Sequence, residues 1–278
     1  YWFGGDSSAA LDSASRALDS AVAIERDDLE ALVRYRRSAA LVFLGEFDRA
    51  AAECEKALGY FDTPKGRDTH MLGGLPFCFC SSFYAWSLAE LGELSRGEYI
   101  GREGFEHARS VGHVYSHGVA SFGFAHALIL RGKFGDAARV LDEAREWTTK
   151  SEARAHLAFL MSRLGFAHAA RGDRTAAIDV AEWFEANPRA LAVVPREASI
   201  PFYMARTEHL LDRPDRPDRI ERHLALAEDR AQRQSEIGVG AWCRFLRGDM
   251  AREAGDQSEA TEHYSAARHV AEERGLKV

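Results

Sequence analysis

Proline and cysteine are scarce in this sequence, and long apolar runs are absent. The seven prolines among 278 residues leave long stretches without a helix-breaking residue. Cys54, Cys78, Cys80 and Cys243 are too few to build the dense disulfide framework of a small secreted domain. No export signal and no apolar stretch of about 18 residues is present. These absences predict a cytoplasmic protein without a membrane partner.

Positive charge is also in deficit. The chain carries 36 Lys and Arg residues against 43 Asp and Glu residues, which gives a formal net charge of −7 and an isoelectric point of about 5.9. A chain with this balance has no global attraction to nucleic acid or to anionic lipid. We therefore expect no direct nucleic-acid partner.

Signatures of enzyme chemistry are missing as well. The sequence contains neither a G-x-x-x-x-G-K-[ST] phosphate loop nor a G-x-G-x-x-G motif. Ser121 lies between Gly118 and Gly123 without the G-x-S-x-G spacing of a nucleophile elbow, and it falls inside a helical pattern. Neighbouring acids such as Asp142 and Glu143 are interleaved with arginine, as on solvated helix faces. We predict that the chain is not an enzyme and that it binds no cofactor.

Metal-ligand spacing is incomplete. His113 and His117 lie one helical turn apart, which fits a zinc-binding histidine pair. The upstream Cys78 and Cys80 lack the C-x₂₋₄-C spacing of a second pair. The alternative, in which the histidines belong to a helix and the cysteines are small core residues, is favoured. We therefore predict no metal site.

What the sequence does contain is a recurring glycine turn between two apolar-periodic stretches. The turn glycine returns after 40, 47, 40, 40 and 83 residues, the last interval being about two units, at Gly5, Gly45, Gly92, Gly132, Gly172 and Gly255. Self-similarity at a period of roughly 20–50 residues is typical of solenoids, whose units bury their apolar faces against their neighbours. The apolar pattern on either side of the turn therefore predicts that each unit consists of a first helix (helix A), the glycine turn and a second helix (helix B).

The second helix of each unit repeats small residues at fixed distances from the turn. These positions are Ala50, Cys54 and Ala57, then Ala137, Leu141 and Ala144, then Ala177, Ala181 and Phe184. In one unit they are replaced by Gly97, Gly101 and Gly104, each of which lowers helix propensity by up to about 1 kcal/mol. We expect that helix to be either looser or in unusually close contact with a neighbour.

Three segments interrupt the pattern. Residues 62–74, 187–201 and 212–218 hold most of the prolines and other helix-incompatible residues, so we predict breaks there. The first residues, Tyr1 to Asp6, match the end of a helix and its turn, which predicts that the chain is a fragment of a longer protein. We otherwise expect a single domain over residues 1–278.

The repeat resembles a known family. Gly-Asp and Gly-Glu-Phe turns, followed by an alanine five residues later, a larger residue after four more and another alanine after three, resemble the tetratricopeptide repeat, a helix–turn–helix unit. The resemblance implies an all-α, right-handed α-solenoid, a superhelix of about six repeats of about 40 residues. Leu41–Leu58, Trp86–Leu94 and His113–Ser116 also resemble the C-terminal repeats of large bacterial (MalT-like) regulators. In those proteins an ATPase module, often with a nucleotide cyclase or a LuxR-type domain, precedes the repeats.

The resemblance further implies which residues face the concave surface. In tetratricopeptide-like stacks, positions six, ten and thirteen residues before the turn glycine point inward. Here these positions of helix A are mostly aromatic, and we call them the aromatic ladder. Two interpretations of the ladder are equally favoured: it lines a binding groove, or it belongs to the core between repeats. The candidate binding residues are Tyr35, Phe79, Trp86, Phe122, His126, Phe159, Phe166, Trp242 and Phe245.

Aromatic side chains with a few polar neighbours suit the capture of a peptide or an apolar ligand. We therefore predict a non-catalytic module of a cytoplasmic bacterial signalling or transcription regulator. It would bind a protein, a peptide or a small effector on its concave face and signal to an N-terminal ATPase or effector domain. The alternative is a structural scaffold that oligomerises its parent protein and has no ligand of its own.

Overall fold

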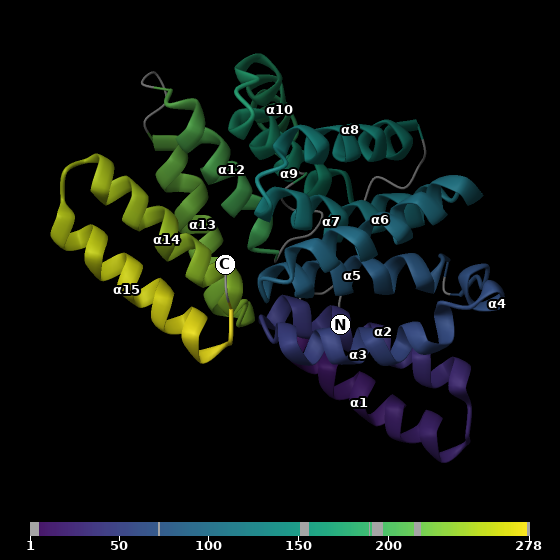
Figure 1. Cartoon of the computed structure of the whole chain (residues 1–278). Helices are drawn as coiled ribbons and strands as arrows, with labels where there is room; N and C mark the ends of the chain where they lie inside the picture. The colour runs from purple at the N-terminus through teal and green to yellow at the C-terminus, as the bar shows by residue number, and fades with distance from the viewer. Residues whose placement is uncertain are drawn as a thin grey trace.

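The computed structural model describes residues 6–71, 73–150, 156–188, 190, 197–213 and 218–276. Within these ranges the chain is helical throughout its regular structure, and the only strand-like pairing is an isolated bridge between Met71 and Gly74. The predicted all-α solenoid is confirmed (Figure 1). Among the described residues, no helix combines the length and apolar character needed to cross a membrane.

In the part of the chain that the structure describes, six helical hairpins follow one another along the superhelix. Their first helices form an inner layer made of α2 (Asp27–Leu44), α5 (Pro76–Glu90), α7 (Val114–Leu130), α9 (Leu157–Ala170), α12 (Ser199–Leu211) and α14 (Ile237–Glu253). Their second helices are α3 (Phe47–Phe61), α6 (Leu94–Val111), α8 (Phe134–Lys150), α10 (Arg174–Ala186), α13 (Asp218–Gln234) and α15 (Gln257–Glu273). Helix α1 (Ser7–Ala23) precedes the first hairpin, and α4 (Pro64–Arg67) is a single turn. The predicted number of about six repeats is confirmed.

The recurring turn has one local conformation. Gly45, Gly92, Gly132, Gly172 and Gly255 all have φ between 72° and 87°, in the left-handed region where a side chain is disfavoured. Where aspartate follows the glycine, its carboxylate caps the next helix: Asp173 accepts from the N–H of Ala176 at 3.2 Å, and Asp256 from that of Glu259 at 2.9 Å. The Gly-Asp pair therefore ends one helix and begins the next.

Neighbouring helices approach closely because small residues lie between them. The small-residue positions predicted in α3 and α8 are fully buried, Ala50, Ala57, Ala137 and Ala144 among them. In α6 the three glycines touch the inner layer: a Cβ at Gly101 would lie 2.8 Å from the Cα of Phe124, and one at Gly104 would lie 2.6 Å from the Cβ of Ser81. Of the two alternatives for this helix, close contact is confirmed.

The three predicted breaks are present, with one correction. Residues 62–74 include α4, which Pro64 begins with Thr63 as its N-cap. In the second segment α10 ends at Ala186 and α12 already begins at Ser199, so the expectation of an irregular chain through Pro201 is wrong. Proline is tolerated there because the first turn of a helix has no N–H partner to lose. Residues 189 and 191–196 of this segment lie outside the described ranges. In the third, α12 ends at Leu211 and α13 begins at Asp218, while residues 214–217 lie outside the described ranges.

The superhelix winds tightly enough for its first and last hairpins to touch. A Cβ on Gly45, in the turn after α2, would lie 2.9 Å from the backbone nitrogen of Gly238 at the start of α14. The ring of Phe47 approaches Gly238 in the same way, with 3.3 Å to an added Cβ. The six inner helices therefore surround a central axis, which sets the shape of every cavity described below.

Candidate functional site

An open groove lies along the last hairpin. It has a volume of about 750 Å³ and runs between α14, α15 and Glu90 at the end of α5. Trp242, Phe245 and Tyr264 form its aromatic wall, with ring centroids 5.9 Å apart for the first two and 5.4 Å for the last two. Phe245 is 44% exposed, whereas most aromatic side chains of the chain are buried. We call this cavity the outer groove.

Charged groups of both signs border the aromatic wall. The hydroxyl of Tyr264 donates to Asp249 at 2.7 Å, and Arg252 approaches the same carboxylate at 3.4 Å. Further along α15, Arg268 pairs with Glu272 at 2.7 Å. An apolar wall with donors and acceptors at its rim is suited to an extended peptide, whose backbone needs hydrogen bonds and whose side chains need pockets.

A second, smaller cavity continues from the outer groove to the superhelix axis. The two share Glu90, Gly238 and Trp242. The inner cavity holds about 30 Å³ of free space, enough for a few water-sized atoms. All six inner helices contribute to its lining, through Val42, Trp86, Glu90, His126, Arg163, Arg206 and Trp242 among others. We call this cavity the inner pocket.

His126 is held in one tautomer at the wall of the inner pocket. Its Nε2 lies 2.9 Å from Glu90 Oε1, and its Nδ1 lies 3.2 Å from the hydroxyl of Tyr203. Because a carboxylate only accepts, Nε2 carries the proton and Nδ1 accepts from Tyr203. Burial lowers the pKa of His126 despite the neighbouring Glu90, so the ring is neutral at physiological pH.

Arg163 is the most unusual residue of the site, because its side chain is completely buried. Its guanidinium carbon lies 3.5 Å from the ring centroid of Phe159 and 4.6 Å from that of Tyr203. Nη2 donates to Ser199 at 3.3 Å. Burial lowers the pKa of Arg163 from its usual value, because the buried guanidinium charge is poorly solvated. Stacking on ring faces offsets part of that cost.

Two buried carboxyl groups lie beside Arg163, at the starts of α12 and α14. Glu197 accepts from the hydroxyl of Ser199, and Glu236 accepts from the N–H of Ala198 at 3.3 Å. Burial raises the pKa of Glu197 to about 7, against the attraction of Arg163. Burial and the charge of Glu197 raise the pKa of Glu236 as well. The cluster therefore holds a proton near neutral pH.

We expect Glu197→Gln to change how stability depends on pH. The folded-state pKa of Glu197 lies above its usual value near 4.5, so its contribution is fully present below that value and is lost as pH rises through about 7. Between pH 5 and pH 8 the wild type should lose about 2 kcal/mol more unfolding free energy than the variant. Urea titrations at both pH values measure the difference. Parallel pH curves would show that Glu197 is solvated.

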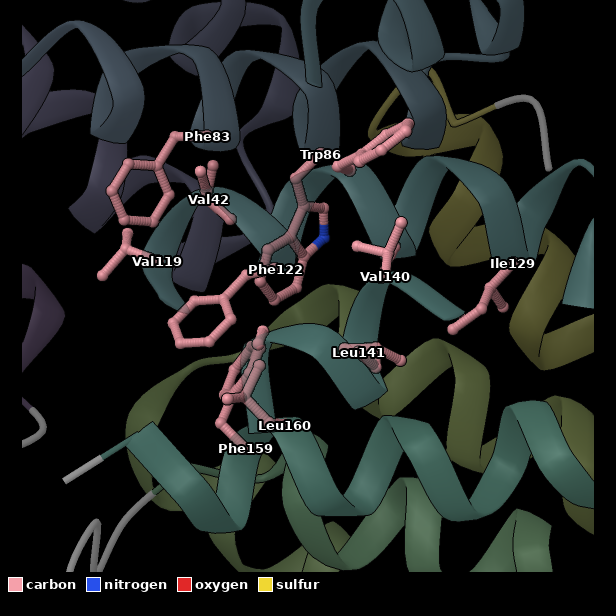
Figure 2. Close-up of a cluster of buried hydrophobic side chains, with 14 of the residues drawn as sticks. Val42, Phe83, Trp86, Val119, Phe122, Ile129, Val140, Leu141, Phe159 and Leu160 are labelled. Atoms are coloured by element: carbon pink, nitrogen blue, oxygen red, sulfur yellow. The ribbon is translucent and has the colours of Figure 1, made fainter. Parts of the chain in front are cut away.

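The structure corrects the placement of most aromatic candidates from the sequence. Seven of the nine are buried in the superhelix core, none more than 6% exposed: Tyr35, Phe79, Trp86, Phe122, His126, Phe159 and Phe166. Figure 2 shows Trp86, Phe122 and Phe159 gathered between α5, α7 and α9, and the rings of the last two lie 4.1 Å apart. Of the two alternatives for these seven residues, inter-repeat core therefore holds and an open groove does not, because the tight winding brings facing inner helices together and packs their rings against one another.

Four of the nine still reach a cavity. Trp86 and His126 line the inner pocket, Phe245 lines the outer groove and Trp242 lines both. Arg163, Arg206, Glu90 and Tyr203, which complete the inner pocket, carry no motif in the sequence. The signal that could have found them is a charged residue inside an apolar inner helix, as with Arg163 in Leu157–Ala170 and Glu90 at the end of Pro76–Glu90.

The histidines and cysteines considered as metal ligands do not assemble. The ring of His117 is stacked on that of Trp147, with 4.3 Å between their centroids, and lies tilted against that of Phe105 at 4.4 Å. Burial lowers the pKa of His117 to about 4. Cys78 and Cys80 are buried free thiols in α5. Within the ranges that the structure describes, no three His, Cys, Asp or Glu side chains are grouped so as to hold a metal ion.

Comparisons with known proteins identify the fold. No protein-family model and no curated protein matches the sequence. A Rap protein in complex with competence and sporulation factor has a TM-score of 0.74 at 11% identity, over 95% of this chain and 70% of that chain. Aspartyl phosphate phosphatase F from Bacillus subtilis has a TM-score of 0.65 at 12% identity, over 98% of this chain and 70% of that chain.

A third solved structure, the Rap conjugation gene regulator of plasmid pLS20 in complex with the Phr* peptide, has a TM-score of 0.62 at 15% identity. The match covers 94% of this chain and 75% of that chain. Likeness at these identities establishes the fold, a helical-repeat solenoid. It carries no information on the ATPase- or cyclase-linked parent that the sequence resemblance implied.

Proposed function

We propose that this chain is a non-catalytic peptide-binding module of a cytoplasmic regulator, with the peptide lying in the outer groove. The observation that carries the proposal is the groove itself: about 750 Å³ of open space beside a partly exposed phenylalanine flanked by two further aromatic rings. Exposed aromatic side chains in a concave site are the usual anchors of peptide and protein partners.

The fold supports the same proposal. Two of the similar structures are complexes, one with competence and sporulation factor and one with the Phr* peptide. Another carries the name of a phosphatase, so the fold alone does not decide between binding and catalysis. Catalysis is disfavoured here because the buried acids and His126 are already engaged in hydrogen bonds: Glu90 with His126, Glu236 with the N–H of Ala198 and Glu197 with the hydroxyl of Ser199.

A signal would pass from the groove through the superhelix. The groove lies between the last hairpin and α5, while the start of α14 touches the turn after α2. A peptide that contacts both sides would favour one curvature of the superhelix over others, and that preference is what a partner domain would read. The proposal includes a parent protein, a bacterial regulator, whose effector domain responds to this change in curvature.

We expect Phe245→Ala to weaken peptide binding by about 1–3 kcal/mol, because it removes the most exposed anchor of the groove. Its effect on stability should be small, since the ring is 44% exposed. Binding is measured with a pooled library of short synthetic peptides passed over the immobilised chain, followed by calorimetry on the peptides retained. Tyr99→Ala is the matched control, because Tyr99 is 63% exposed on the outer helix α6 and lines neither cavity.

The scaffold alternative predicts a different result. If the chain only oligomerises its parent, no peptide from the pool is retained by the wild type, and sedimentation shows self-association that neither variant changes. Retention of peptides that bind wild type and Phe245→Ala equally would place the binding surface elsewhere on the superhelix.

A further inference from the structure

Three positions of the inner helices recur at the joint between successive hairpins. They lie thirteen, ten and six residues before the turn glycine. In α5, α7 and α9 every residue at these positions is buried, at no more than 6% exposure. In α14 the same positions hold Trp242, Phe245 and Asp249; Phe245 is 44% exposed and the other two are partly exposed. The last hairpin therefore lacks a cover that the hairpins before it have.

In those earlier hairpins the cover is the next inner helix. One contact at each joint shows this: the hydroxyl of Ser82 in α5 donates to Val119 in α7 at 2.7 Å, the ring centroid of Phe122 in α7 lies 4.1 Å from that of Phe159 in α9, and Phe166 in α9 lies 5.6 Å from Tyr203 in α12. Each inner helix thus lies on the same three positions of its predecessor.

The outer helices contribute to the same joint, nine residues after the turn glycine. In α3 the carbonyl of Cys54 accepts from the thiol of Cys80 in α5 at 3.4 Å. In α6 a Cβ on Gly101 would lie 2.8 Å from the Cα of Phe124 in α7. The corresponding residue of α15, the last helix that the structure describes, is Tyr264, which lines the outer groove. By register, the outer groove is the place of a next inner helix.

The two ends of the superhelix differ in the surface that they expose. On α1 the exposed side carries Ser8, Asp12 and Asp19. A polar outer face of this kind is typical of the capping units that end a solenoid. The last hairpin instead exposes Phe245 beside Trp242. An aromatic surface at this joint calls for a partner that covers it.

We propose that the outer groove binds an amphipathic α-helix, which takes the place of a seventh inner helix. The proposal rests on the proposed function and specifies the conformation of the ligand. An extended peptide could use only the polar groups at the rim, because α14 and α15 are helices that pair their own backbone groups. A helix satisfies its own backbone and presents a row of side chains to Trp242 and Phe245.

The position six residues before the turn glycine specifies one feature of that helix. In α9 this position holds Phe166, on which Arg206 of the next inner helix stacks at 3.9 Å. In α14 it holds Asp249, and the hydrogen bonds from Tyr264 and Arg252 both reach its Oδ1. Oδ2 is left for a further donor. We therefore expect the bound helix to place an arginine or a lysine opposite Asp249.

A helix of the chain itself provides the probe. A synthetic peptide that copies α12, Ser199–Leu211, already has the register of an inner helix and carries Arg206 at the required place. We expect calorimetry to show that the acetylated and amidated peptide binds the wild-type chain. Phe245→Ala in the chain should weaken this binding about 10- to 100-fold, whereas Tyr99→Ala, on the outer helix α6, should leave it unchanged.

Variants of the peptide test its conformation and its charge. Thr207→Pro in the peptide should weaken binding about 10- to 100-fold relative to Thr207→Ala, because only proline breaks the helix. Asp249→Asn in the chain should weaken binding about 2- to 5-fold for the peptide with Arg206, and not for an Arg206→Met peptide. Equal affinities of the proline and alanine peptides would overturn the helix.

The outcomes separate this proposal from the proposed function. If pooled short peptides are retained through Phe245 while the α12 peptide does not bind, the ligand is extended, which overturns the helix and leaves peptide binding intact. If the α12 peptide binds through Phe245 and no pooled peptide is retained, the helix is supported and the proposed function is contradicted. Binding of neither contradicts both. Dimers in sedimentation that Phe245→Ala abolishes would show that a second copy of the chain occupies the groove, which also contradicts the proposal.

Discussion

Gly123→Ala is expected to destabilise the fold by about 3 kcal/mol or more, at the upper end of overpacking effects. A Cβ on Gly123 would lie 1.8 Å from the carbonyl oxygen of Ser82 and 2.9 Å from its Cα, so the clash is with the backbone of α5. The N–H of Gly123 also donates to the Ser82 hydroxyl at 3.0 Å, which in turn donates to Val119 at 2.7 Å. Relief would require α5 and α7 to separate, which opens the core shown in Figure 2.

Helix propensity alone would make a Gly→Ala change stabilising, so a glycine in open space provides the control for Gly123→Ala. Alanine is favoured over glycine inside a helix by up to about 1 kcal/mol, less than the steric cost at Gly123. Gly59→Ala in α3 has no atom within 4 Å of the added Cβ, so this variant should be slightly stabilised. Chemical denaturation of both variants measures the contrast. A Gly123→Ala variant as stable as the wild type would show that α5 and α7 lie further apart than described.

Arg219→Met is expected to cost about 3–5 kcal/mol, because it leaves a buried carboxylate without its partner. Arg219 on α13 donates to Glu208 on α12 at 2.8 Å, and their side chains are 2% and 5% exposed. The same guanidinium also pairs with Glu185 on α10. One arginine therefore joins three helices of two successive hairpins in a region where the turn lacks a glycine. Urea denaturation followed by circular dichroism measures the loss.

The double variant Arg219→Met with Glu208→Met separates charge from packing. Removing both charged groups leaves no buried unpaired ion, so the double variant should recover most of the stability that the single variant loses. If Arg219→Met cost less than about 1 kcal/mol, the pair would behave as a surface salt bridge, which would contradict its burial.

The repeat architecture was predictable because its signals are local. A turn glycine acts through its own φ, an aspartate caps a helix three residues away, and the spacing of apolar residues reports the face of a single helix. Gly5 lies outside the described residues. The other turn positions, the helical hairpins and the buried small residues of α3 and α8 were found where the sequence placed them. The sequence also identified Trp242 and Phe245, which lie in the outer groove.

The sequence left open whether the aromatic ladder faces a groove or the core, because no local signal distinguishes the two. Trp86, Phe122 and Phe166 have the expected phase on their helices, but whether that phase faces a groove or a filled core depends on how tightly the superhelix winds. That curvature accumulates from contacts between hairpins, such as the approach of Gly101 to Phe124 and of Gly45 to Gly238. A small difference in the angle between successive hairpins has no signature within the sequence of one repeat. Added over six repeats, it decides whether the superhelix axis is open or filled.

The sequence by itself thus determined the class of fold, the repeat, the turns and the faces along which helices pack, because residues close together in the chain produce each of them. Only the tertiary structure decided that the ladder is core, that the last hairpin leaves an open groove, and that Arg163, Arg206 and Trp86 meet around one small pocket. Arg163, Glu90 and Tyr203 come from three hairpins and share no motif. Their proximity results from the winding that brings distant inner helices around a common axis.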